Sequence, residues 1–364
     1  MPLDPSDRFR ACLLAGAVGD ALGAPVEFDA HADIVRRFGP AGLRDHADGK
    51  YPAGSITDDT QMTLFTAEGL LRAHVRGCLR GLTSHVGVTH HAYLRWYATQ
   101  GGHPALEIGR DGWLWPLRAL HARRAPGNTC LGALGAARSF GTPAVNGSKG
   151  CGGVMRMAPL GLFMWRSRCE GDLAATTFAT GCELAALTHG HPDGQAPAGV
   201  LALLVLRLVE GVPLREALPE ALSFVARDER YAGTLVALQR AVALADGGVA
   251  PGAAAVESLG GGWVADEALA IALYCALVAG DDLERGVVLA VNHGGDSDST
   301  GAIAGNLLGA ALGTGAIPAR WLEPLELRDE IAAMADDLAA YREWDVDEYG
   351  GADNDRVWER YPGW

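Results

Sequence analysis

The chain has 364 residues, of which 49% are apolar and 20% are charged, and this composition excludes an intrinsically disordered protein. Its 49 glycines follow no collagen repeat, which excludes a fibrous fold. Thirty basic residues against 44 acidic ones leave a formal charge of −14, and no run of Lys or Arg interrupts the excess. General binding to a nucleic-acid backbone or to an anionic membrane is therefore disfavoured, and a cationic partner or a bound metal is favoured.

The cysteines and the N-terminus predict a cytoplasmic protein. The cysteine number is odd and no C-x-x-C pair occurs, so neither a disulfide framework nor a structural zinc site is expected. Asp4 and Asp7 stand where a signal peptide would need an apolar segment, so none is expected. The seven cysteines are Cys12, Cys78, Cys130, Cys151, Cys169, Cys182 and Cys275.

Apolar residues recur with a helical period along most of the chain, and they predict an all-α fold. The first segment follows Ser6 as a cap and is expected to end at Gly23 and Pro25. Alternating Val, Ile and Thr runs of the strand type are scarce, and composition does not shift across the Gly-rich joints, so a single domain over 1–364 is expected. The predicted helices span 7–22, 60–75, 86–98, 130–139, 172–187, 197–210, 234–245, 266–278, 282–291 and 328–343.

The stretch 300–319 carries no charged residue and has glycines at 301, 305 and 309, a pattern that also occurs in membrane helix pairs. Its threonines, Asn306 and Pro318 are poorly suited to hydrocarbon. We therefore interpret the glycines as a seam at which two helices of a soluble bundle approach closely.

Two polar clusters, 55–60 and 294–300, are each expected just before a helix. Helix capping explains one acceptor in each cluster. Each cluster nevertheless offers two carboxylates, Asp58 with Asp59 and Asp296 with Asp298, and adjacent carboxylates repel unless a cation lies between them. All these donors are hard oxygen atoms, which favour Mg²⁺, Mn²⁺ or Ca²⁺ over zinc. Caps and a binuclear metal site both remain open, and the second requires that the clusters meet.

These motifs resemble the ADP-ribosylglycohydrolase family over about 9–311. The resemblance implies a compact orthogonal helical bundle, in which 312–364 form a C-terminal helix and tail. It also implies two Mg²⁺ ions, with Mn²⁺ as an alternative, and hydrolysis of the bond from C1″ of ADP-ribose to an acceptor. The expected partner is an ADP-ribosylated protein or another ADP-ribosyl conjugate, acted on by a monomer. The residues that carry the resemblance are 16–23, Glu27, 57–60, 149–156, His189 and 294–301.

Residue by residue, the resemblance implies catalytic roles for Glu27 and Asp59, although Glu27 also fits a solvated surface acid. Ser299 stands where many members have threonine, and either hydroxyl can bind a metal. The metal ligands that it implies are Thr57, Asp58, Asp59, Asp296, Asp298 and Ser299.

The resemblance also implies substrate contacts, each of which has a plainer alternative. The Gly-rich loop 147–156 can be an ordinary loop. Residues 127–129 can be an ordinary helix start, and His189 can be a histidine that is stabilised at a helix C-terminus. Cys151 stands where many members have asparagine, which leaves the acceptor open. The substrate-binding residues that it implies are Gly127, Asn128, Thr129, Gly150, Gly152, Gly153 and His189.

Two other functions are weighed against this hydrolase. The first is an inactive ADP-ribose-binding or crystallin-like structural protein, which would have no reason to keep every acid. The second is metal-dependent phosphoryl hydrolysis, for which Lys149 and Arg156 would have to clamp the phosphate. The Gly-rich loop 260–263 precedes the predicted helix that carries Glu267 and can border the cleft, but it is given no role.

Overall fold

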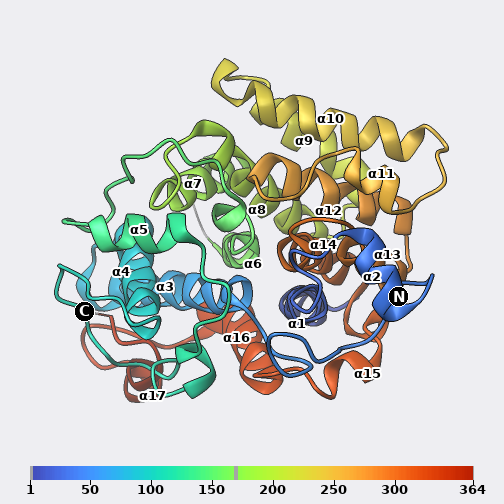
Figure 1. The fold of residues 1–364 in the computed structure, drawn as a ribbon. Helices are drawn as coiled ribbons and strands as arrows, with labels where there is room; N and C mark the ends of the chain where they lie inside the picture. Colours follow the sequence, from blue (N-terminus) through green and yellow to red (C-terminus); the bar gives the residue numbers. More distant parts are fainter. Residues whose placement is uncertain (1–2, 168–170, 364) are drawn as a thin grey trace.

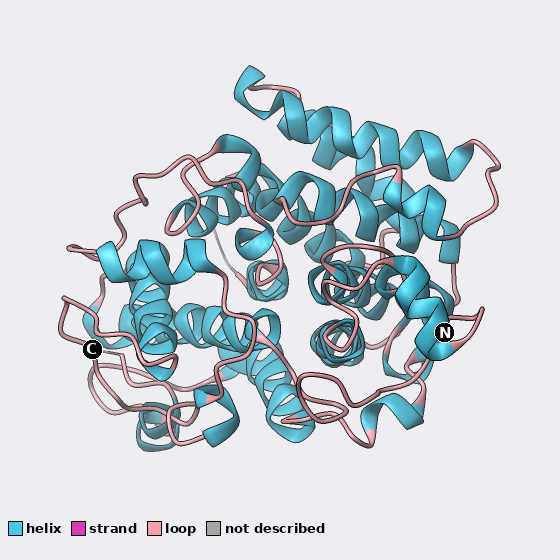
Figure 2. Ribbon diagram, in the orientation of Figure 1, coloured by secondary structure: helices cyan, strands magenta, loops and turns pink. Residues whose placement is uncertain are grey.

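The computed structural model describes residues 3–167 and 171–363, and these residues fold into helices without a strand (Figure 2). Cys169 lies outside them, and the six other cysteines are free thiols. The helices are α1 (Pro5–Gly23), α2 (His31–Phe38), α3 (Asp58–Arg80), α4 (His85–Thr99), α5 (Asn128–Ala136), α6 (Ala158–Arg166), α7 (Leu173–Ala186), α8 (Ala196–Val209), α9 (Leu214–Val225), α10 (Ala232–Asp246), α11 (Ala253–Glu257), α12 (Ala265–Ala279), α13 (Leu283–Val291), α14 (Ser297–Leu312), α15 (Ala319–Leu322), α16 (Arg328–Ala340) and α17 (Asn354–Arg360).

The predicted all-α fold is confirmed, and each of the ten predicted segments is a helix. Nine of them match their expected bounds within three residues, whereas α3 continues five residues past its expected end, to Arg80. Sequence periodicity missed α2, α6 and α9, as well as the short α11, α15 and α17. Helix α6 is almost wholly apolar, so no polar face marks its period. Helix α9 contains Pro219, which removes one backbone donor and reads in sequence as a break.

Helices α1 and α14 form the seam predicted from the glycines. A Cβ atom added to Gly305 would lie 2.0 Å from the carbonyl oxygen of Ala15, and one added to Gly19 would lie 2.0 Å from that of Gly301. The two backbones are therefore in contact, which only residues without a side chain permit. None of the described helices is both long enough and apolar enough to cross a bilayer.

Figure 1 shows α1 and α14 end-on, while α3 lies to their left and runs in the plane of the view. These steep angles between helices are those of the orthogonal bundle that was predicted. One buried apolar cluster extends from Phe9 to Tyr361, so the C-terminal segment packs on the same core as the rest. A Cβ atom on Gly23 would lie 2.2 Å from the carbonyl oxygen of Ser297, so the end of α1 touches the start of α14.

Candidate active site

Asp20, a buried carboxylate on α1, fastens the start of α3 to the central helix pair. It accepts hydrogen bonds from the Thr57 backbone N (3.0 Å), the Thr57 hydroxyl (2.7 Å) and the Thr60 hydroxyl (2.5 Å). Burial, and then the charge of Asp298, raises its pKa to about 7. Sequence analysis gave Asp20 no role, although a lone acid in an otherwise apolar stretch of helix was the signal that could have found it.

The first polar cluster runs into α3, because residues 58–60 form the first turn of that helix. Thr57 caps the helix and Asp58 begins it, so the predicted start at Thr60 was two residues late, because the aspartates occupy the first turn. The Gly127 backbone N–H donates to Asp58 at 3.1 Å, which fixes one carboxylate oxygen. Asp59 Oδ1 is buried and accepts no hydrogen bond from the described residues.

The second cluster begins α14. Asp296 is the N-cap, whereas Asp298 and Ser299 lie in the first turn, so the expected D-x-D loop is half helical. The Ser299 backbone N–H donates to Asp298 Oδ1 at 2.9 Å. The Thr57 hydroxyl lies 3.4 Å from Asp298 Oδ2, and this contact joins the two clusters. Sequence left open whether the clusters meet, and the tertiary structure brings them together.

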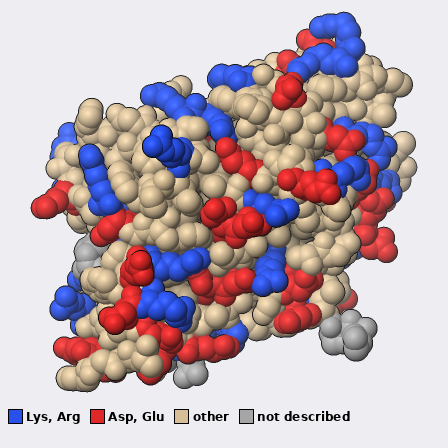
Figure 3. Space-filling view, turned by 90° about the horizontal axis from the view of Figure 1, so that it is seen from below, with Lys and Arg blue, Asp and Glu red and all other residues tan. Residues whose placement is uncertain are grey.

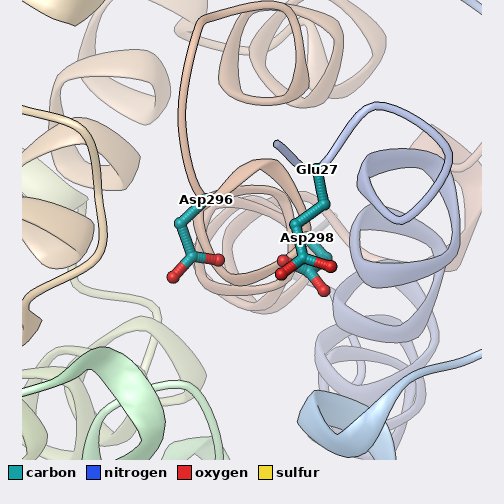
Figure 4. A group of neighbouring side chains, drawn as sticks. All are labelled: Glu27, Asp296 and Asp298. Carbon is teal, nitrogen blue, oxygen red and sulfur yellow. The ribbon is translucent and has the colours of Figure 1, made fainter. Parts of the chain in front are cut away.

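Glu27 reaches the same place from the loop after α1. One carboxylate oxygen each from Glu27, Asp296 and Asp298 lies within 4.8 Å of the others, and Figure 4 shows the three side chains directed into one space. Burial raises the pKa of Glu27 to about 10, and the charges of Asp298, Asp296 and Asp58 reinforce the shift.

The aspartates behave in the same way. Burial, and then the charge of Asp298, holds the pKa values of Asp58, Asp59 and Asp296 well above their usual range. A divalent cation would relieve this repulsion, and the oxygen donor set together with the unpartnered Asp59 Oδ1 fits a hard ion such as Mg²⁺.

Figure 3 shows one outer face, on which basic side chains are scattered among acidic ones without forming a continuous patch.

A cleft of about 630 Å³ opens over these carboxylates. Most of the residues expected to bind metal or substrate line it, but two are set back from its surface. Thr57 is buried beneath the aspartates, and Gly153 packs against the carbonyl oxygen of Gly194. The expected residues on the lining are Glu27, Asp58, Asp59, Gly127, Asn128, Thr129, Gly150, Gly152, His189, Asp296, Asp298 and Ser299.

His189 supports the Gly-rich loop from below. Its ring Nδ1 lies 2.8 Å from the Thr188 hydroxyl, and burial followed by the charge of Arg156 lowers its pKa to about 3. The ring is therefore neutral at physiological pH. A Cβ atom on Gly152 would lie 2.8 Å from Cys130 Sγ and 3.2 Å from this ring, so the packing favours glycine there.

Cys151 occupies the middle of the loop and faces the second cluster. Its Sγ donates to Asp296 Oδ2 at 2.9 Å, so the residue that departs from the family pattern contacts a metal-site candidate directly.

The family model for ADP-ribosylglycohydrolase matches residues 1–347. The chain belongs to the ADP-ribosylglycohydrolase family. The match continues well past Ala311, where the motif resemblance ends, and it includes α16, which packs on α1, α3 and α6.

Two relatives of known name match nearly the full chain. It is 28% identical to the ADP-ribosyl-[dinitrogen reductase] glycohydrolase of Rhodospirillum rubrum, over 92% of this chain and 96% of that protein. It is 25% identical to the ADP-ribosylarginine hydrolase of Serratia proteamaculans, over 91% of this chain and 79% of that protein. The solved structure of an ADP-ribosylglycohydrolase-related protein complex matches with a TM-score of 0.66 and 32% identity, covering 93% and 98% of the two chains. Membership in this family indicates that the protein is a hydrolase that acts on an ADP-ribosyl group.

Proposed function

We propose that this protein hydrolyses the glycosidic bond between C1″ of ADP-ribose and an acceptor, with two Mg²⁺ or Mn²⁺ ions as cofactors. The observation that carries the proposal is the convergence of Glu27 and two aspartate clusters from α3 and α14 at the base of one cleft. A set of helix caps needs no such convergence, since each helix start requires only one acceptor.

The proposed metal ligands are Thr57, Asp58, Asp59, Asp296, Asp298 and Ser299. Bound there, the ions would neutralise the four aspartates, orient the ribose hydroxyl groups and increase the acidity of a water molecule. Asp20 and the Gly127 backbone N–H hold the first cluster in place through Thr57 and Asp58.

Glu27 is the proposed proton carrier, with Asp59 as the other candidate. In the reaction, the bond from C1″ to the acceptor atom breaks and the oxygen of water bonds to C1″. The carboxylate takes the proton that water loses and delivers it to the departing acceptor. The position of Glu27 favours this role, because its carboxyl group converges with those of Asp296 and Asp298, where the proposed ions and their water would bind.

The cleft wall offers the proposed contacts for the rest of ADP-ribose. The N-terminus of α5 presents backbone N–H groups near Asn128 and Thr129, which suit the diphosphate. Gly150 and Gly152 permit a close approach of the backbone, and His189 supports that wall. Gly153, set back from the cleft, is proposed to support the loop and not to contact substrate.

The phosphoryl-hydrolase alternative loses its expected clamp. Arg156 is fully buried, lies over the Tyr93 ring at 4.2 Å and donates to Thr188. Lys149 pairs with Asp266 at 3.6 Å. Neither residue lines the cleft.

A direct assay tests the proposal. The protein is incubated with Mg²⁺ and with arginine-, serine- or guanine-linked ADP-ribose, and free ADP-ribose is measured. We expect release from at least one substrate, and none from any of them would contradict the proposal. A matched sample with EDTA in excess over metal separates metal-dependent turnover from spontaneous cleavage.

A further inference from the structure

An exposed aromatic pair stands at the mouth of the cleft, beside Glu27. The rings of Phe28 and Trp263 stack with their centroids 5.0 Å apart and an angle of 21° between their planes. Phe28 remains 70% exposed and Trp263 42% exposed, and both line the cleft. Two large apolar side chains held together in solvent are unusual at a surface and mark a binding site when they border a cleft.

The backbone holds Phe28 in a conformation that most residues avoid. Its φ angle is 72°, in the left-handed region, which residues with a Cβ atom rarely adopt. The turn is fixed because the Val26 and Glu27 backbone N–H groups both donate to the Gly23 carbonyl at 3.0 Å. The exposed Phe28 ring therefore lies at the rim of the cleft, whereas the Glu27 carboxylate converges with those of Asp296 and Asp298 (Figure 4).

Trp263 belongs to a loop that is fastened on both sides. The Cys151 backbone N–H donates to the Trp263 carbonyl at 3.2 Å, and the Asp296 backbone N–H donates to the Gly261 carbonyl at 2.8 Å. Glu267 accepts from the Gly261 backbone N–H at 3.0 Å. The loop is therefore a fixed bridge between the Gly-rich wall and the second aspartate cluster, so Trp263 is preorganised.

We propose that Phe28 and Trp263 form an acceptor platform, which holds a planar, delocalised cation of the guanidinium type beside Glu27; this inference rests on the proposed function. Aromatic faces attract cations, and a guanidinium group can stack flat on them. The platform selects the acceptor and leaves ADP-ribose to the deeper cleft.

The test uses Phe28→Leu and Trp263→Leu, which keep an apolar side chain but remove the aromatic face. Trp358→Leu is the matched control, because Trp358 is 41% exposed on α17, away from the cleft lining. Calorimetry with Mg²⁺ and ADP-ribose present measures the affinity for agmatine, a free guanidinium compound, and for butylamine, which lacks the planar group. KM and kcat are measured with arginine- and serine-linked ADP-ribose.

We expect both cleft variants to weaken agmatine binding and to raise KM for the arginine-linked substrate by about 3- to 30-fold. Their affinity for ADP-ribose alone and their KM for the serine-linked substrate should stay within about twofold of the parent. Equal losses for ADP-ribose alone would assign the pair to the ADP-ribose site and overturn the platform, as would unchanged agmatine binding. The agmatine measurement needs no turnover, so it tests the platform even if the parent hydrolyses none of the substrates.

Discussion

At the scale of single residues, each aspartate cluster combines a structural task with a proposed chemical one. Asp296 caps α14 through the Ser299 backbone N–H, and Asp58 accepts from the Gly127 backbone N–H. Each of these hydrogen bonds uses one oxygen of its carboxylate. Capping does not explain why five acidic side chains lie together in one cleft, namely Glu27, Asp58, Asp59, Asp296 and Asp298.

Asp58→Asn and Asp296→Asn should therefore each remove nearly all hydrolase activity and leave the helical circular dichroism close to that of the parent. An amide caps a helix about as well as a carboxylate, but it is a poor ligand for Mg²⁺. The check is the rate of ADP-ribose release beside the dichroism spectrum. Rates near the parent value in both variants would reduce the clusters to helix caps.

Glu27→Gln should lower the hydrolysis rate by about 10²–10⁴-fold and preserve the affinity for ADP-ribose. The amide keeps the shape of the side chain but cannot carry a proton. Calorimetric affinity and single-turnover rate are measured on the same preparation. An unchanged rate would move proton transfer to Asp59, and loss of both quantities would make Glu27 a structural support.

His90 gives a prediction about pH that is independent of the acidic site. Its Nδ1 accepts from the Gly141 backbone N–H at 3.0 Å, and burial, followed by the charge of Arg156, lowers its pKa to about 4. The unfolded chain binds a proton at this residue below about pH 6.5 and the folded protein does not, so stability is lost as pH falls.

In His90→Asn this linkage is absent, although the amide oxygen can still accept from Gly141. The variant should be less stable than the parent at pH 7.5, and the difference should shrink by about 2 kcal/mol when urea unfolding is repeated at pH 5. Carboxylates contribute equally to both proteins and cancel. If the difference in unfolding free energy between variant and parent is the same at both pH values, His90 takes up a proton in the folded protein by pH 5, as it does in the unfolded chain.

At the scale of elements, the contact between α1 and α14 positions the site. The helix that ends before Glu27 and the helix whose first turn carries Asp298 touch along their backbones, so any separation moves both carboxylates. The seam therefore contributes to catalytic geometry as well as to stability.

Gly305→Ala should destabilise the protein by about 1–3 kcal/mol or more, because the added methyl group meets the Ala15 carbonyl oxygen and the backbones must part. Gly132→Ala on α5 is the control, since a Cβ atom there has no neighbour within 4 Å. That change should be neutral or stabilise by up to about 1 kcal/mol, as helix propensity predicts. The denaturant midpoints of the two variants are compared, and Gly305→Ala should have the lower one. Equal midpoints would contradict tight packing at the seam.

At the scale of the whole molecule, one buried cluster links residues from α1 to α17. We propose on this ground that the chain is a single domain. The proposed ions would bind between α3 and α14, two elements far apart in sequence, so bound metal should stabilise the entire fold and not one segment.

Unfolding should accordingly be one cooperative thermal transition, and Mg²⁺ should raise its midpoint by mass action on the folded state. Exhaustive treatment with EDTA should lower the midpoint and abolish turnover, and Mg²⁺ or Mn²⁺ should restore both. Calorimetric scans and activity are compared on the same samples. Full activity after the chelator has been dialysed away would rule out the proposed metal centre.

The sequence by itself determined the helical class, ten helices and the seam, because helical periodicity and glycine spacing are local properties of a chain. It also placed the candidate acids in two short motifs. Only the tertiary structure decided that those motifs meet, through Asp20 and the 3.4 Å contact from Thr57 to Asp298, because a contact across 241 residues depends on how helices pack. The role of Asp20 and the stack of Phe28 on Trp263 were hidden for the same reason.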